Sequence, residues 1–206
     1  MLETLLMVKR GIYQPPLYGT VAAGFYAIKT EAEVISAAAL ATAIGLTAGT
    51  PETSVPPSWL EFSLQGKRCL YATRAFRYGL SWDHIYNVGA AFDTLGDQGV
   101  PPTVTVRPQD TEVTIGGQRY RVRLMTMAEW VSVVPKLTGT WVPSTSDKMN
   151  IGTNNGSARW ILDTYLTNYN KRRNRGGYTG VNFDGLGTST DTTAIMGWSP
   201  LLEPIE

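Results

Sequence analysis

The junction between a strand and a helix near the middle of the chain constrains the fold more than any other sequence feature. Residues 120–124, which read Tyr-Arg-Val-Arg-Leu, alternate as a half-buried strand does. Thr126 and Glu129 then have the spacing of a capping box, in which two side chains bind free amides at a helix start. Trp130 follows on the first helical turn. We therefore expect the Glu-Trp turn to lock a strand to a helix that ends before Pro135.

Turn signals predict two hairpins and a further short helix between them. Residues 59–76 have the pattern of two strands around a turn at Gln65-Gly66. Residues 113–126 predict a second hairpin that turns at Gly116-Gly117. Between the hairpins, Ser81 is a candidate N-cap for a helix that reaches about Val88.

The first 57 residues differ in composition and pattern from the rest of the chain and predict a separate N-terminal region. Residues 1–29 mix glycine and proline with tyrosine and valine, which favours an irregular or hairpin-like arm that packs on something else. Thr30 and Glu33 form a capping-box pattern that opens a helix to about Leu46. The proline-rich segment 47–58 is typical of a linker. We therefore divide the chain into a region 1–57 and a domain 58–206.

The last third of the sequence predicts loops around one more helix. Residues 138–156 are rich in Gly, Ser, Thr and Asn, and Ser157 then caps a predicted amphipathic helix over 158–169. A polar loop follows, and the chain closes with a predicted terminal strand. Because Pro200 cannot donate a ladder hydrogen bond, that strand should be an edge or end there. The order of elements indicates an α+β fold with short hairpins, two to three helices and long loops.

Cysteine, histidine and charge limit the chemistry open to the chain. Cys69 is alone, which excludes an internal disulfide and a cysteine-based zinc site. His84 is the one histidine and the one candidate base for a Ser-His or Cys-His mechanism; a packed or solvent-facing histidine is the simpler interpretation. The acidic loops lack the ligand spacing of a calcium loop. We expect no metal, no cofactor and no catalytic residue.

The N-terminus and the net charge bear on location and partners. Glu3 and a short apolar run make a poor signal peptide, and no apolar stretch reaches 18 residues, so we expect synthesis in a reducing cytosol and no membrane insertion. The net charge of +1 argues against a polyanion-coating protein. The basic cluster Lys171–Arg175 favours a solvated or subunit-bridging role over direct nucleic-acid binding.

Three motifs in order resemble the formylglycine-generating, sulfatase-modifying-factor family, a branch of the C-type-lectin-like folds. Residues 123–130 are similar to that family's Arg-Leu-Pro-Thr-Glu-Ala-Glu-Trp signature. The matching positions are Arg123, Leu124, Thr126, Ala128, Glu129 and Trp130, whereas Met125 and Met127 depart from it. Residues 81–83 resemble its Ser-Trp-Glu-Asp helix, and residues 175–177 its Arg-Gly-Gly-Ser element. The resemblance implies a lectin-like body. From the residues themselves, we expect Trp130 to pack against the hairpin and Trp82 and Trp198 to join the same core. The family's enzymes use a pair of copper-binding cysteines, so one cysteine speaks against that oxidase activity.

A second resemblance covers residues 59–206 and points to structural proteins of tailed bacteriophages. Its carriers are segments 80–92 and 113–124 together with the C-terminal Gly-Trp-Ser-Pro-Leu-Leu-Glu. Those proteins usually have arginine where this chain has Ser199. The resemblance implies a virion subunit of the tail, baseplate or capsid surface, whose partners are other virion proteins and copies of itself.

Two functions therefore stay open. The first is a non-enzymatic virion structural protein that assembles through residues 1–57. The second is a host-receptor or glycan-binding module that uses its long loops, because loops on a rigid scaffold commonly carry binding. The candidate ligand-binding residues of that module are Trp141, Asn154, Asn155, Tyr178 and Asn182.

Overall fold

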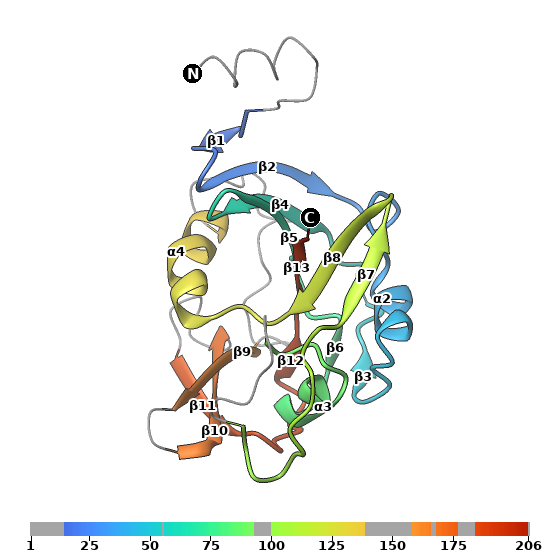
Figure 1. Ribbon diagram of the computed structural model, residues 1–206, viewed down its shortest axis with the longest axis vertical. Coiled ribbons are helices and arrows are strands. Elements are labelled where there is room, and N and C mark those ends of the chain that lie inside the picture. Colours follow the sequence, from blue (N-terminus) through green and yellow to red (C-terminus); the bar gives the residue numbers. More distant parts are fainter. Residues whose placement is uncertain are drawn as a thin grey trace.

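Two β-sheets and three helices make up the described part of the chain (Figure 1). The computed structural model describes residues 15–54, 56–92, 100–138, 158–165, 168–176 and 184–205. This arrangement is a mixed α+β fold, mostly strands, as the sequence predicted. Among the described helices, none combines the length and apolar character that crossing a bilayer requires.

Each sheet is assembled from strands that lie far apart in the sequence. The seven-stranded sheet contains, in spatial order, β1 (Tyr18–Gly19), β2 (Gly24–Lys29), β4 (Trp59–Leu64), β5 (Lys67–Ala72), β13 (Leu201–Pro204), β8 (Gln118–Arg123) and β7 (Glu112–Ile115). The six-stranded sheet contains β11 (Asp184–Thr188), β10 (Asn168–Gly176), β9 (Ala158–Tyr165), β12 (Met196–Trp198), β6 (Arg77–Tyr78) and β3 (Thr50–Pro51). The helices are α2 (Ala37–Ala43), α3 (Trp82–Asn87) and α4 (Met127–Thr138). Only β9 and β12 pair in parallel among the described strand pairs.

Both predicted hairpins are confirmed, and their turns explain their register. Gln65 and Gly66 have φ of 53° and 83°, and Gly116 and Gly117 have φ of 57° and 84°. Two successive residues with positive φ form the type I′ turn, whose twist matches that of two antiparallel strands. β4 therefore pairs with β5, and β7 with β8, across two-residue loops.

The last described strand lies inside the seven-stranded sheet. Of the two alternatives predicted for the terminal strand, the edge position is wrong, because β13 pairs with β5 on one side and β8 on the other, and the end at Pro200 is confirmed. Pro200 does end a strand, because β12 stops at Trp198 and β13 starts at Leu201. The chain crosses from one sheet to the other at this point, where a residue without an N–H costs no ladder bond.

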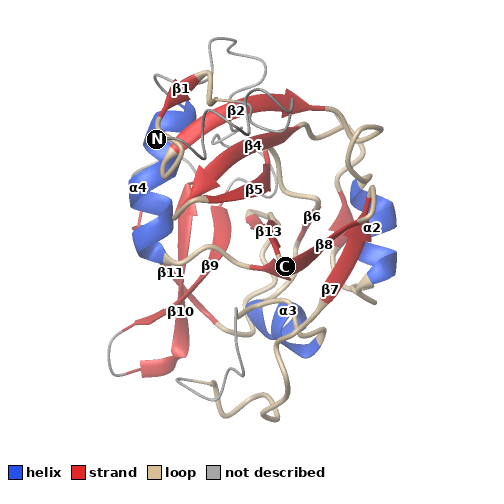
Figure 2. Cartoon of the chain, turned by 45° about the horizontal axis from the view of Figure 1, so that its top comes forward, coloured by secondary structure: helices blue, strands red, loops and turns tan. Residues whose placement is uncertain are grey.

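Two cores account for the buried side chains, because the seven-stranded sheet is covered on both faces. Every residue of β4 is buried: Leu60 and Phe62 pack with Trp130 of α4, while Trp59 packs on the opposite face. Trp82 and Trp198 belong to this second, larger core, which also receives side chains of α2 and α3. Figure 2 shows α4 and α2 at opposite flanks of the sheet. All three predicted tryptophans are buried, but Trp130 lies in a separate core.

Two predicted helix boundaries are wrong for local reasons. Thr30 and Glu33 form one of the two capping-box contacts: the Thr30 amide donates to Glu33 Oε2 at 2.8 Å, whereas the Thr30 hydroxyl donates to the same oxygen at 2.8 Å and the Glu33 amide donates to the Thr30 carbonyl. They close only a turn, and α2 begins seven residues after Thr30 behind Ser36, whose side chain accepts from the Ala39 amide. The helix α4 continues through Pro135. Because proline has no amide hydrogen, the Val131 carbonyl, four residues earlier, loses its helical hydrogen bond. Val131 lies on the exposed side of the helix, where water can bind that carbonyl.

The amphipathic helix predicted over residues 158–169 is also wrong. Residues 158–165 form β9, which pairs with β10 and β12, and Lys171–Arg175 lies in β10 instead of a loop. Trp160 is buried, and its indole N–H donates to the Leu80 carbonyl at 2.8 Å. Trp, Ile, Thr and Tyr are favoured in strands, and long-range pairing decided a pattern that helical periodicity also fitted.

Residues 18–51 are part of both sheets and of the larger core. β2 pairs with β4, β3 pairs with β6 at the edge of the other sheet, and Leu40 of α2 is fully buried. The predicted linker 47–58 therefore contains the two-residue strand β3. The division of the chain at residue 57 stays a prediction.

Candidate functional site

The five residues predicted to bind a ligand lie outside the described part of the chain. These are Trp141, Asn154, Asn155, Tyr178 and Asn182. Their role stays a prediction.

The Glu-Trp turn is held by a buried network of charges. Arg123, the last residue of β8, is 4% exposed. Its Nη1 and Nη2 donate to the two carboxylate oxygens of Glu129 at 2.8 and 2.7 Å, and its Nε donates to Glu203 of β13 at 2.7 Å. Glu203 also pairs with Lys67 of β5. Glu129 and Thr126 complete the predicted capping box at 2.8 and 3.1 Å.

The pKa values of this network follow from its contacts. Burial lowers the pKa of Arg123, but the hydrogen bonds and charges of Glu129 and Glu203 outweigh it and hold the pKa above its ordinary value. Burial raises the pKa of Glu203, but hydrogen bonds from Lys67 and Arg123 outweigh it and hold the pKa below its ordinary value. Arg123 and Glu203 therefore stay charged at neutral pH, and the network ties four elements together: β8, α4, β13 and β5.

The chain's one histidine is exposed, and its one cysteine is buried. His84 is solvent-facing at the third position of α3, where its Nδ1 accepts from the Ser81 amide at 3.2 Å. Cys69 is 1% exposed, and burial raises the pKa of its thiol to about 12. A thiol with that pKa is protonated at neutral pH and is a poor nucleophile.

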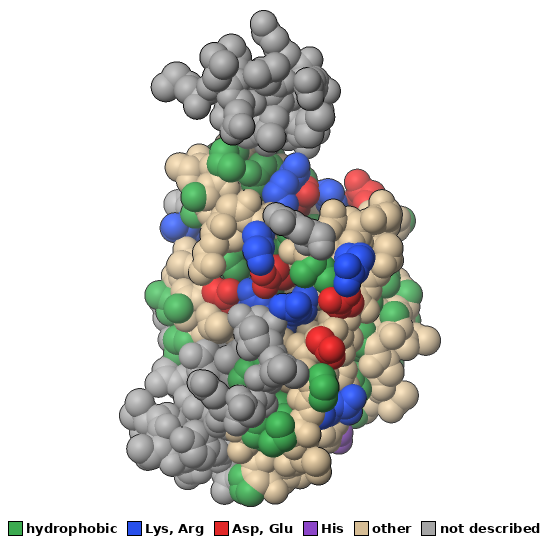
Figure 3. Space-filling view, in the orientation of Figure 1, with side chains coloured by type: hydrophobic (Ala, Val, Ile, Leu, Met, Phe, Trp, Pro, Cys, Tyr) green, Lys and Arg blue, Asp and Glu red, His purple; other side chains and the backbone are tan. Residues whose placement is uncertain are grey.

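An apolar surface lies on the β1–β2 hairpin; we call its residues Leu17, Tyr18, Val21 and Ile28 the hairpin surface. Leu17 is 67%, Tyr18 43% and Val21 45% exposed, three of the five large exposed apolar residues in the described chain. Leu17, Tyr18 and Ile28 line a hollow of about 330 Å³ together with the buried Phe25. Apolar atoms gather at this end of the molecule in Figure 3.

Hydrogen bonds hold this hairpin in a fixed position on the neighbouring strands. The Gly24 amide donates to the hydroxyl of Ser63, which is fully buried in β4, at 2.6 Å. The Gly66 amide of the next turn donates to the Ala22 carbonyl at 3.2 Å. A side chain at Gly24 would meet the Thr20 carbonyl at 2.5 Å, so this turn requires glycine. The exposed apolar side chains are therefore carried by a hairpin whose turn is held in place by hydrogen bonds to the neighbouring strands.

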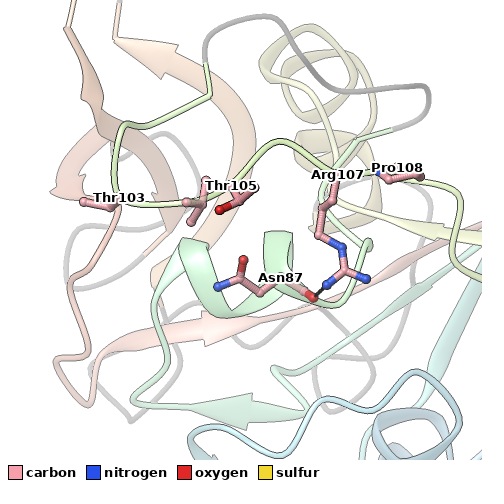
Figure 4. Close-up of a pocket in the computed structure, with 6 residues that line it drawn as sticks. Asn87, Thr103, Thr105, Arg107 and Pro108 are labelled. Carbon is pink, nitrogen blue, oxygen red and sulfur yellow. Dashed lines mark hydrogen bonds between the residues drawn. The ribbon is translucent and has the colours of Figure 1, made fainter.

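A polar pocket lies between α3 and residues 103–108, with a volume of about 460 Å³ (Figure 4). Asn87 lies below it on α3, and the loop above contributes polar and apolar side chains. The lining residues are Asn87, Thr103, Val104, Thr105, Arg107 and Pro108.

The loop above the pocket is fixed to α3 by several hydrogen bonds. Gln109, which is fully buried, donates to the Tyr86 carbonyl at 3.0 Å and accepts from the Ala91 amide at 3.1 Å. The Arg107 amide donates to the Tyr86 hydroxyl at 3.2 Å, and the Arg107 guanidinium donates to the Asn87 carbonyl. These hydrogen bonds fix the position of the loop relative to α3.

A buried carboxylate lies on the same helix as the pocket residue Asn87. Asp83 is one helical turn before Asn87 and is 7% exposed. Within the described residues, no hydrogen-bond donor contacts its buried Oδ1. Its amide donates to the Ser189 carbonyl at 3.1 Å, and the Ser189 hydroxyl lies 3.3 Å from the hydroxyl of Thr103 in the pocket wall.

The sequence indicated several of these side chains but not the distant residues that they contact. The Thr126–Glu129 spacing was visible, but nothing local signalled that Arg123 and Glu203 complete the network. The Gly- and Pro-rich composition of residues 1–29 did indicate a hairpin-like arm that packs on something else, which is where the hairpin surface lies. The pocket had none, because α3 and residues 103–108 meet only in the fold.

No protein-family model matches this sequence, and no curated protein matches it either.

Proposed function

We propose that the protein is a non-enzymatic structural subunit of a tailed-bacteriophage virion, in the tail, the baseplate or the capsid surface. Its body would be a C-type-lectin-like domain, as the motif resemblance implies, and its location the virion. Its partners would be other virion proteins and copies of itself, contacted through the N-terminal region 1–57. The observation that carries this proposal is the hairpin surface.

Exposed apolar side chains on a tied turn are typical of a contact surface. Single exposed apolar residues are common, but a cluster around a hollow is favoured at sites where another protein binds. Burying side chains such as Leu17 and Tyr18 would stabilise a contact by about 25 cal/mol per Å² of apolar area. A surface held in place by Ser63 also loses little conformational freedom on binding.

Edge geometry supports the same assembly role. β1 is two residues long and pairs with β2 only at Phe25 and Gly24. Edge strands with apolar faces are sites where a further strand or chain can add. A virion subunit needs such surfaces, because each copy contacts neighbours in the particle.

Incorporation into particles tests the proposal. The tagged full chain would be supplied during infection, and purified particles would be probed for it by mass spectrometry and labelled electron microscopy. We expect the wild-type chain and Val106→Asp to be incorporated, and Leu17→Asp/Val21→Asp to be lost. Val106 is a matched control because it is an apolar residue exposed at 59% outside the hairpin. Particles that lack the wild-type chain, or that take up the double variant equally well, would refute the proposal.

The alternative is a host-receptor or glycan-binding adhesin that uses the long loops of residues 58–206. It is compatible with the structural role, since a virion part also contacts the host. Its test is adsorption to host cells after Trp141→Ala, compared with the unaltered chain. Equal adsorption by both would argue against these loops.

A further inference from the structure

We propose that the hairpin surface binds residues 2–8 of a second copy of this chain, so that neighbouring copies exchange their N-terminal segments. The inference rests on the proposed assembly role and names the partner that the hairpin surface takes. Residues 1–14 lie outside the described part of the chain, and the binding site consists of described residues alone.

The hollow in the hairpin surface is continuous with the smaller core. Phe25 belongs to the core that contains Trp130, and Ile28 packs against that core. The Tyr18 ring stacks on the Phe25 ring with their centroids 6.5 Å apart, yet Tyr18 is 43% and Leu17 67% exposed. An apolar side chain that enters the hollow would therefore extend an existing core and remove these exposed side chains from water.

The hairpin surface is too small to join two copies by itself. Its four partly exposed side chains offer roughly 200–400 Å² of apolar area. A stable, specific interface buries about 800 Å² on each partner. Two copies that met only through their hairpin surfaces would fall well short of this, so the occupant must bring apolar area from another part of the chain.

Residues 2–8 supply apolar area of the kind required. They read Leu-Glu-Thr-Leu-Leu-Met-Val, in which five of seven residues are large and apolar. Unbranched methionine adapts its shape to irregular hollows. β1 is the outermost strand in the order of the seven-stranded sheet, so an extended segment can add beside it. Alternate side chains of an added strand point to one face, and this face would fill the hollow.

The N-terminal segment leaves from a fixed point beside the hollow. A Cβ added at Gly24 would meet the Pro16 Cβ at 2.7 Å, so Pro16 lies against the turn, and the Leu17 amide donates to the Phe25 carbonyl at 2.7 Å. Pro15 and Pro16 have a fixed φ and no amide hydrogen, which disfavours a tight reversal onto the same hairpin.

The segment is also long enough to reach another copy. The residues before Pro15 span at most about 45 Å when extended. A compact chain of this length has a radius of gyration of about 17 Å. Residues 2–8 therefore reach the hairpin surface of an adjacent molecule.

Photocrosslinking of the full chain tests the exchange. Leu5→p-benzoylphenylalanine would be irradiated in the purified chain and in particles, and the crosslinked peptides would be mapped by mass spectrometry. We expect covalent dimers in which position 5 of one copy is joined to residues 17–28 of another. The same label at Val106, which is 59% exposed outside the hairpin, should give no crosslink to residues 17–28.

Matched variants show whether the dimer depends on the hairpin surface. Leu17→Asp should lower the yield of crosslinked dimer about tenfold or more, because it removes an apolar contact and places a charge in the hollow. Val106→Asp should leave the yield unaltered. If Leu17→Asp changes the circular dichroism spectrum, Val21→Asp decides, and an unaltered yield in that variant overturns the proposal.

The outcomes separate this inference from the virion role. Crosslinks from position 5 to residues 17–28 within a single chain, or to a different virion protein, would overturn exchange between copies. Particles that contain the chain without crosslinked dimers would overturn the exchange and leave the virion role standing. Crosslinked dimers of the purified chain, combined with particles that lack it, would support the exchange and refute the virion role.

Discussion

Replacing Arg123 by methionine should destabilise the fold far more than the same change at Arg119 on the same strand. Arg123 is 4% exposed and holds Glu129 and Glu203, whereas the Arg119 side chain is 57% exposed and pairs with Glu112 near the strand end. Both changes remove one guanidinium from β8. The comparison therefore isolates the effect of burial.

The structure sets the size of each effect. Arg123→Met leaves the Glu129 carboxylate without its cationic partner and leaves Glu203 with Lys67 alone. Removing one member of a buried ion pair costs about 3–5 kcal/mol. An exposed ion pair contributes about 0–1 kcal/mol. Because a domain of ordinary stability unfolds with about 5–15 kcal/mol, the first change should remove a large share of the total.

Urea unfolding followed by tryptophan fluorescence measures both effects, since Trp130 lies on the turn that Glu129 caps. In a double-mutant cycle, Arg123→Met/Glu129→Met should recover part of the unfolding free energy lost in Arg123→Met, because the second change removes a carboxylate left without its cation. An Arg123→Met variant that unfolds within about 0.5 kcal/mol of Arg119→Met, the range of ordinary surface substitutions, would refute this reasoning.

Three further predictions concern single groups. The free energy that Glu203 contributes to folding should be fully present above its unfolded-state pKa, near the ordinary value of 4.5, and should be lost as pH falls through its lowered folded-state pKa. Urea unfolding measured between neutral pH and pH 3 should therefore show a weaker loss of stability with acid in Glu203→Gln than in the unaltered chain. Cys69 should react with a thiol reagent much more slowly in the native chain than in urea, because its pKa of about 12 keeps it protonated and it is buried; equal rates would contradict this. Gly89→Ala should lower the unfolding temperature more than Gly45→Ala does. Both residues have φ near +75°, but only a Cβ added at Gly89 would meet the Thr111 hydroxyl, at 2.6 Å. Equal losses would show that the loop around Gly89 can move to make room for the methyl group.

Features set by neighbouring residues were predictable from the sequence. The turns at Gln65-Gly66 and Gly116-Gly117 depend on residues that tolerate positive φ, and the N-caps at Ser81 and Thr126 depend on side chains three residues from their partners. Such short-range contacts are encoded where they occur.

Features set by distant partners were not predictable. Residues 158–165 became a strand because β12 and β10 lie beside them, and β13 became central because β5 and β8 meet there. The Thr30–Glu33 box shows the same limit in reverse, since the contact forms without a helix behind it. Among the candidate sites, the pocket between α3 and residues 103–108 depends on two segments that meet only in the fold.

Hydrogen exchange at the hairpin surface tests the central claim most directly. Amides of residues 17–28 would be compared by mass spectrometry in the free chain and in purified particles that contain it. The assembly role predicts slower exchange in particles at these residues, and unchanged exchange at residues 103–108 if that pocket stays open. Equal exchange at residues 17–28 in both samples would contradict assembly through this surface.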